Sequence, residues 1–288
     1  MMRIAPVPNC GSNLGESPIW NDLDQALYFV DVTAYALCRY TPNDGLCRRW
    51  VFGKPIAALA LTASPKLLLI FRSSIAFFDC TSGDLVDLPV SPVDSDERYN
   101  DARIDAQGRL WVGTFDRLMK RPLGKLYCLT NKVLRCVDEG FMLSNGIAFS
   151  PDRLTMYFAD TWSRCIHAYD FCLESGAIAN QREHIRFDGD GGPDGCAMDS
   201  EGYLWVAVVG GGEIVRYDPE GIPHTRVKVG VSKPTSCTFG GPLHDRLYVT
   251  SMRHGLTSAT LAKQPLAGQM FEIEGTQSIG IAEERFQQ

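Results

Sequence analysis

Apolar residues occur along this chain in short runs that come in pairs, and a tight turn separates the two runs of each pair. Residues 194–210 (DGCAMDSEGYLWVAVVG) show the pattern most clearly, because two apolar stretches flank a polar turn that contains Gly202. Short apolar runs bounded by turn residues are typical of β-strands, and glycine readily adopts the positive φ that many tight turns require. The segment therefore predicts a β-hairpin.

The same hairpin pattern occurs six times in the chain. A large residue opens the second strand of each copy, and successive copies are 41 to 48 residues apart: Tyr28, Leu69, Trp111, Tyr157, Trp205 and Tyr248. A third short run, ending in turn residues, follows each hairpin. Six phased units of this length predict an all-β fold, a six-bladed β-propeller with a central channel. A ring of blades closes on itself, and we expect residues 1–288 to form a single domain.

The ends of the chain have different expected roles. Residues 3–8 (RIAPVP) could supply the outer strand of the last blade and so close the ring, because unpaired sheet edges are a liability. The last six residues (EERFQQ) are mostly polar, and we expect them to be frayed.

Composition argues against several classes of partner. A net charge of −6 disfavours nucleic acid, which needs a basic face. No apolar run is long enough to predict a transmembrane helix, and residues 1–10 lack the apolar segment of a secretory signal. The ten cysteines contain no Cys-x-x-Cys pair, which favours buried, reduced thiols over a zinc cluster or a disulfide framework. We therefore expect a cytoplasmic protein without nucleic-acid or membrane partners.

Polar residues recur at the start of the predicted inner strands. Counting back 11 to 13 residues from the large residue of a unit gives Glu16, Asn100, Asn145, Asp194 and Thr235. Inner strands line the channel of a propeller, so side chains at one phase converge near its axis. Two carboxylates and two carboxamides form an oxygen-rich cluster that suits a hard divalent cation, and no lysine or arginine at these positions offsets the negative charges. The pattern predicts a metal site.

Each of these residues also has a simpler interpretation. Asn145-Gly146 and Asp194-Gly195 are common turn dipeptides. Asn100 could cap the start of a strand, and Glu16 could be a surface residue. Turn geometry does not explain why two acidic residues share one repeat phase, so the common phase favours the metal site.

Several sequence blocks together resemble the senescence marker protein, gluconolactonase and luciferin-regenerating enzyme family of six-bladed propellers. They span nearly the whole chain: LGESPIW (14–20), RYNDARIDAQGRLWVGT (98–114), SNGIAFSPD (144–152), PDGCAMDSEGYLWVA (193–207), KPTSCTFGG (233–241) and the segment 251–271. The resemblance implies a metal-dependent lactonase in which Glu16, Asn145 and Asp194 coordinate the metal. It also implies that Asp194 transfers protons, that Asn100 contacts metal-bound water or substrate, and that Arg98 hydrogen-bonds the sugar lactone.

The resulting hypothesis is hydrolysis of a small sugar lactone, gluconolactone-like, to its aldonic acid in carbohydrate metabolism. The oxygen ligands permit Ca²⁺, Mn²⁺, Mg²⁺, Zn²⁺ or Fe²⁺. Two alternatives remain open: a hydrolase of other esters or organophosphates at the same site, and a non-catalytic propeller that binds a protein and holds a structural metal.

Two neighbouring features carry weaker expectations. Asp101 is expected to be structural. The segment 116–124 contains Arg117, Lys120 and Arg121 and is shorter than the lid of many relatives. Its basic character is a hint of an anionic or larger substrate, although a solvated loop is the simpler interpretation.

Overall fold

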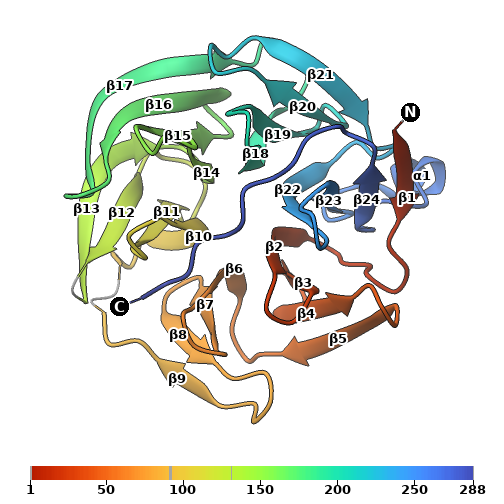
Figure 1. Cartoon of the computed structure of the whole chain (residues 1–288), viewed down its shortest axis with the longest axis horizontal. Helices are drawn as coiled ribbons and strands as arrows, with labels where there is room; N and C mark the ends of the chain where they lie inside the picture. Colours follow the sequence, from red (N-terminus) through yellow and green to blue (C-terminus); the bar gives the residue numbers. More distant parts are fainter. Residues whose placement is uncertain (1, 91–92, 131, 288) are drawn as a thin grey trace.

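Six four-stranded antiparallel sheets surround a central channel, as Figure 1 shows. The structure is a computed structural model that describes residues 2–90, 93–130 and 132–287. In each sheet the strands follow chain order from the channel outward, apart from the last sheet. The predicted six-bladed β-propeller is confirmed.

The first three blades comprise residues 15–141. The first contains β2 (Gly15–Asn21), β3 (Ala26–Asp31), β4 (Ala36–Thr41) and β5 (Leu46–Val51). The second contains β6 (Ile56–Leu61), β7 (Leu67–Phe71), β8 (Ile75–Phe78) and β9 (Leu85–Asp87). The third contains β10 (Glu97–Ile104), β11 (Leu110–Asp116), β12 (Gly124–Thr130) and β13 (Val133–Phe141).

The remaining blades follow in the same order around the ring. The fourth contains β14 (Ser144–Phe149), β15 (Thr155–Asp160), β16 (Cys165–Cys172) and β17 (Ala177–Arg186). The fifth contains β18 (Gly192–Met198), β19 (Leu204–Val209), β20 (Glu213–Tyr217) and β21 (Pro223–Lys228). The sixth contains β22 (Pro234–Gly240), β23 (Arg246–Ser251), β24 (Phe271–Glu274) and β1 (Arg3–Pro6). A short helix, α1 (Ser258–Lys263), lies between β23 and β24.

Strand β1 closes the ring. It pairs antiparallel with β24, with Arg3 opposite Glu274 and Pro6 opposite Phe271, so it is the outer strand of the sixth blade. The expectation for residues 3–8 is confirmed, with the strand itself ending at Pro6. Within the described chain, no helix combines the length and apolar character needed to cross a bilayer.

The large residues that mark the repeat lie in the core. Trp111, Trp205 and Tyr248 are fully buried. The indole N–H of Trp111 donates to Asp105 Oδ2 at 2.7 Å, and that of Trp205 donates to Asp199 Oδ2 at 3.0 Å. A buried tryptophan needs such a partner for its one polar atom. The repeat phase is therefore a packing requirement, since each blade needs one large side chain at this position.

The C-terminal segment crosses one end of the channel instead of fraying (Figure 1). Phe286 is 3% exposed and packs in the core between the second and third blades. Its backbone N–H donates to the carbonyl of Leu61 at 2.9 Å, and its carbonyl accepts from the N–H of Ala63 at 3.0 Å. The expectation of a frayed tail is wrong for residues 283–287, because one aromatic anchor and backbone pairing hold them; Gln288 lies outside the described residues.

Candidate metal and substrate site

A β-bulge interrupts every inner strand near its start. The pairing register between inner and second strands shifts after these residues: Glu16, Ile56, Tyr99, Asn145, Pro193 and Pro234. A bulge inserts an extra residue and re-aims the side chains around it. The polar residues at the common repeat phase therefore occupy equivalent places in their blades, at or beside the bulge.

The two Asn-Gly and Asp-Gly dipeptides are not turns. Gly146 lies within β14 and Gly195 within β18. A Cβ atom added to Gly195 would lie 2.0 Å from Ser236 Oγ, and one added to Gly146 would lie 2.5 Å from the carbonyl oxygen of Asp194. The glycines are required because the inner strands of adjacent blades approach closely beside Asn145 and Asp194, so the turn interpretation is wrong for both.

Three carboxylates lie within electrostatic reach of one another at this end of the channel. Burial raises the pKa of Asp194 well above its usual range, and the charges of Glu16 and Asp101 raise it further. Burial, followed by the charge of Asp101, raises the pKa of Glu16 to about 8, against the opposing effects of the Ser17 N–H and Arg72. The arrangement concentrates negative charge where water is scarce, which is unfavourable unless a cation is present.

Asp101 has the structural contact expected from the sequence and also acts electrostatically on the candidate site. Its Oδ1 accepts the backbone N–H of Ala102 at 2.8 Å, which is a structural contact. Its charge nevertheless acts on both Glu16 and Asp194. Asp101 is thus part of the electrostatic environment of the candidate site.

The two carboxamides are joined across the third and fourth blades. Asn100 Nδ2 donates to Asn145 Oδ1 and to the carbonyl of Ser144, both at 2.7 Å. Asn145 Nδ2 donates in turn to Thr161 Oγ1 at 2.7 Å. These bonds fix both amides in one orientation, and a carbonyl oxygen has a second lone pair that can still bind a cation.

The side chain of Thr235 makes a different kind of contact from the other residues at its repeat phase. Its Oγ1 donates to the carbonyl of Gly15 and lies 2.9 Å from Thr250 Oγ1. Its hydroxyl is thus occupied in joining the sixth blade to the first.

The residues present fit a divalent cation. Asp194 is 4% exposed, and its Oδ1 has no hydrogen-bond partner among the described residues. A buried carboxylate oxygen without a partner is costly, and a cation would both satisfy it and offset the repulsion between the carboxylates. The described residues contain no group of three or more His, Cys, Asp or Glu side chains arranged to hold a metal. A cation here would therefore depend on the Asn145 carboxamide in addition to Glu16 and Asp194.

Arg98 lies two residues before Asn100 on β10. Its Nη1 donates to the carbonyl oxygens of Ser95 at 2.9 Å and Glu97 at 2.6 Å. Burial lowers the pKa of Arg72, and the charge of Arg98 lowers it further, so the two guanidinium groups lie within electrostatic reach.

Arg72 is the residue that the sequence reasoning missed. It follows β7 directly, and its Nη1 donates to Asn100 Oδ1 at 2.7 Å and to the carbonyl of Tyr99 at 2.9 Å. Its guanidinium lies 4.9 Å from the centre of the Phe115 ring. The repeat phase gave no signal for it, because the second blade has Ala57 at its bulge and Arg72 comes from the end of the second strand. A positive charge therefore does accompany the carboxylates, although none occupies the phase positions themselves.

In the basic segment 116–124, Arg121 pairs with carboxylates of the protein itself. Arg121 Nη2 donates to Asp96 Oδ2 at 2.8 Å and to Asp116 Oδ1 at 2.9 Å. The hydrogen bond from Arg121 holds the pKa of Asp116 well below its usual range. Arg121 therefore offers no uncompensated charge to a ligand, and the hint of an anionic substrate loses this support.

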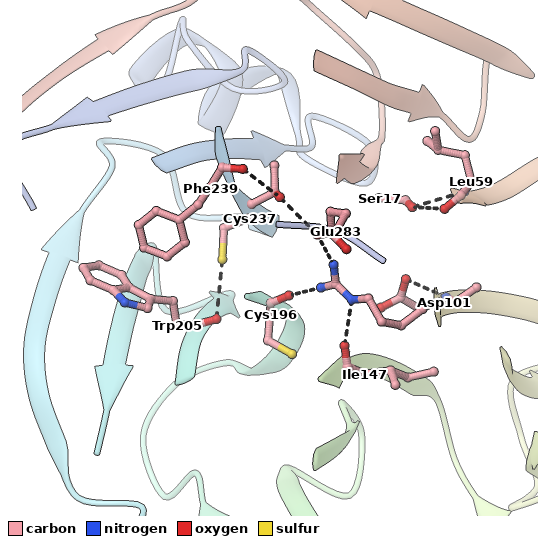
Figure 2. A network of polar contacts seen from close by, with 12 residues as sticks. Ser17, Leu59, Asp101, Ile147, Cys196, Trp205, Cys237, Phe239 and Glu283 are labelled. Carbon is pink, nitrogen blue, oxygen red and sulfur yellow. Dashed lines mark hydrogen bonds and ion pairs between the residues drawn. The ribbon is translucent and has the colours of Figure 1, made fainter. Parts of the chain in front are cut away.

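Between the candidate site and the C-terminal segment, the channel is filled by protein groups. The guanidinium of Arg103 donates to the carbonyl of Ile147 at 3.0 Å and to that of Cys196 at 2.6 Å, and it pairs with Glu283 of the C-terminal segment (Figure 2). A hollow of about 240 Å³ lies beside this network, lined by Phe171, Met198 and other mainly apolar residues. It lies near the C-terminal ends of the inner strands, away from the bulges, and is not the site described above.

A propeller with oxygen donors around one end of its channel is the class of protein that the fold and this site define. Residues 14–253 match the family described as the SMP-30/Gluconolactonase/LRE-like region, and the chain belongs to this family. The sequence is 34% identical to regucalcin of Oryctolagus cuniculus over 285 residues, which cover 95% of this chain and 94% of that protein. It is also 34% identical to regucalcin of Homo sapiens over 286 residues, with the same coverage.

Solved structures agree with this assignment. The fold is similar to that of a regucalcin from Agrobacterium tumefaciens, described as a calcium-binding protein, with a TM-score of 0.92, 26% identity and coverage of 98% of this chain and 96% of the other. A luciferin-regenerating enzyme gives a TM-score of 0.91, 27% identity and full coverage of both chains. A gluconolactonase from Xanthomonas campestris has the same fold at 20% identity, with a TM-score of 0.78 over 95% of this chain and 89% of that chain.

Proposed function

We propose that the protein is a divalent-metal-dependent lactonase that hydrolyses a small sugar lactone to the corresponding aldonic acid. The observation that carries this proposal is the buried Asp194 carboxylate, whose Oδ1 lacks a hydrogen-bond partner among the described residues although Glu16 and Asp101 also place negative charge there. Membership of a family that includes gluconolactonases supports the choice of a lactone as substrate.

Glu16, Asn145 and Asp194 would hold the metal. Their oxygen donors suit Ca²⁺ or Mg²⁺ and also permit Mn²⁺, Zn²⁺ or Fe²⁺. The comparison with a calcium-binding regucalcin favours Ca²⁺ as the first ion to test. A bound divalent ion polarises a carbonyl oxygen and lowers the pKa of water.

Asp194 is suited to move the proton in this reaction. Hydrolysis adds water to the lactone carbonyl carbon, breaks the bond to the ring oxygen and leaves an acid and an alcohol. As a carboxylate among the proposed metal ligands, Asp194 can accept the proton of the attacking water. The same carboxyl group can then return the proton to the departing ring oxygen.

Asn100 and Arg98 are placed to bind the substrate. Asn100 is held by Arg72, Ser144 and Asn145, which fixes its amide beside the metal ligands. Arg98 has donors beyond the one that contacts Ser95 and Glu97, and a guanidinium can bond lactone hydroxyls or the carbonyl oxygen.

The test is hydrolysis of a panel of lactones by protein stripped with a chelator and then given one divalent ion at a time. Proton release is measured against the spontaneous rate, in wild type and in Asp194→Asn. We expect activity to depend on an added ion and to be lost in the variant. Glu220→Gln, an exposed acidic position on the fifth blade, is the control for a general effect of charge.

The two other hypotheses give different results in the same assay. Metal-dependent hydrolysis of aryl esters or phosphotriesters, without lactone hydrolysis, would assign the site to another hydrolase. A metal that raises Tm in wild type but supports no hydrolysis would indicate a structural ion in a binding protein.

A further inference from the structure

Two guanidinium groups, those of Arg72 and Arg98, lie at the same end of the channel as the candidate metal ligands. They come from adjacent blades, since Arg72 follows β7 and Arg98 belongs to β10. Both side chains are partly buried. Arginines at such a place are expensive to desolvate and need a partner for their charge.

Hydrogen bonds fix the position of Arg72, but most of its N–H donors make no hydrogen bond to the described part of the chain. Nη1 makes the two bonds to Asn100 and Tyr99, and the ring of Phe115 supports the guanidinium plane. Neither Nε nor Nη2 of Arg72 has a protein acceptor within residues 2–90, 93–130 and 132–287. Arg98 likewise uses only Nη1 among those residues. Each group therefore keeps donors for a ligand.

The charges at this end of the channel do not balance once a metal is bound. A divalent ion would offset the two carboxylates of Glu16 and Asp194. Asp101 lies next to Arg103, which is itself paired with Glu283. The ion, Arg103, Arg72 and Arg98 together then exceed the carboxylates of Glu16, Asp101, Asp194 and Glu283 by one positive charge, which has no matching anion among these groups. Burial lowers the pKa of Arg72 only to about 10 and so leaves it protonated at neutral pH.

We propose that Arg72 and Arg98 form a subsite for an anionic group of the substrate, so that the preferred substrates are lactones that also carry a free carboxylate. A planar guanidinium matches a planar carboxylate through two parallel hydrogen bonds, whereas a neutral hydroxyl uses only one donor. This inference rests on the proposed lactonase function, because it assigns the substrate class for the same site. Hydrolysis of such a lactone gives a sugar diacid.

The kinetic test compares a neutral lactone with a charged one. Wild type and Arg72→Gln are assayed with gluconolactone, with the monolactone of glucaric acid and with a phosphorylated gluconolactone. We expect wild type to prefer the glucaric lactone, and Arg72→Gln to raise KM for that lactone about tenfold more than it raises KM for gluconolactone.

Two further variants separate charge from structure. Arg72→Lys keeps the charge and should retain part of the preference. Arg117→Gln removes an exposed arginine from the neighbouring segment and should change neither KM. If Arg72 served only to position Asn100, Arg72→Gln would lower kcat for all three lactones alike, and that result would overturn the subsite. A stronger preference for the phosphorylated lactone would overturn the assignment to a carboxylate.

A binding measurement separates failure of the subsite from failure of the lactonase proposal. Calorimetry on protein containing a divalent ion compares glucarate, with a carboxylate at each end, with gluconate, which has one. Tighter binding of glucarate by wild type, lost in Arg72→Gln, supports the subsite even if no lactone is hydrolysed. Equal binding of both acids by the two proteins rejects the subsite even if gluconolactone is hydrolysed.

Discussion

The two ends of the central channel are built from similar polar groups but differ in how those groups are satisfied. At the end crossed by the C-terminal segment, Arg103 donates to two carbonyl oxygens and pairs with Glu283. At the other end, Asp194 Oδ1 has no hydrogen-bond partner in the described chain, and Glu16 and Asp101 repel the charge beside it. Satisfied buried polar groups rigidify a fold, whereas unsatisfied ones are costly.

This difference supports the proposal that the end with the unsatisfied groups binds a ligand. A network whose donors and acceptors are all matched has nothing left to offer a small molecule. A cluster of carboxylate oxygens and guanidinium donors without partners destabilises the protein until a ligand binds. Loss of stability at a functional site is a common cost of function. The predictions below test this contrast, from the largest expected effect to the smallest.

The largest effect is expected at Asp194. Asp194→Asn should lower kcat/KM for a lactone by about a thousandfold, because it removes the group that we propose to accept and return the proton. The same change should raise Tm in metal-free protein, since it removes a desolvated charge next to Glu16. Enzyme assays and thermal unfolding without metal check both parts. Lower stability in the metal-free variant would contradict the view that this end is strained.

The next effect is expected at the closed end. Phe286→Ala should lower the free energy of unfolding by about 3 kcal/mol, because Phe286 is buried between the second and third blades. Its activity per folded molecule should change little, since the anchor lies away from the proposed metal ligands. Urea unfolding measures the loss, and Phe286→Leu, which keeps most of the apolar volume, should lose clearly less. A wild-type midpoint in Phe286→Ala would mean that the tail is not held.

A smaller loss is expected for the ion pair of Glu283. Glu283→Gln should lower the free energy of unfolding by about 2 kcal/mol, because it leaves the Arg103 charge without its carboxylate in a mostly buried place. Arg103→Met combined with Glu283→Gln should lose less than the two single changes together, since neither charge then lacks its partner. Additive losses in this cycle would show that the pair is not coupled.

The smallest effect is expected at Arg121. Arg121→Gln should leave lactone KM unchanged, because Asp96 and Asp116 already neutralise this arginine. Its effect on Tm should depend on pH. The folded-state pKa of Asp116 is lowered by Arg121, so the stabilisation is present above the unfolded pKa of aspartate. The difference in Tm between wild type and variant should persist at neutral pH and shrink below about pH 4. A changed KM would indicate that segment 116–124 takes part in substrate binding.

The repeat could be predicted from the sequence because one packing requirement recurs six times. Trp111, Trp205 and Tyr248 fill equivalent positions in their blades, so their spacing gives the number and length of the units. The phase of Glu16 and Asp194 could be predicted for the same reason, since a bulge recurs at that place in each blade. The structure places these residues at one end of the channel, while their roles as metal ligands and acid-base group stay predictions.

Arg72 and Phe286 could not be predicted in this way, because both act across blades rather than within the repeat. Arg72 reaches Asn100 from the neighbouring blade, where Ala57 leaves the phase position without a polar side chain. Phe286 is one aromatic residue in a polar segment, and its burial depends on the channel end formed by distant strands. The basic character of segment 116–124 hinted at an anionic substrate for a related reason. Asp96, which pairs with Arg121, is distant in sequence, so the pairing could not be predicted.

The pairing of β1 with β24 has a consequence for the order in which the protein folds during synthesis. Arg3 and Glu274 are opposite each other in one sheet, although nearly the whole chain separates them. The first five blades take all their strands from continuous stretches, so each can form as it leaves the ribosome. The sixth blade must wait until residues 271–274 have emerged, and the edge of β1 has no strand partner until then. Ring closure is therefore a late, long-range event, the kind of step that slows folding and exposes strand edges to other chains.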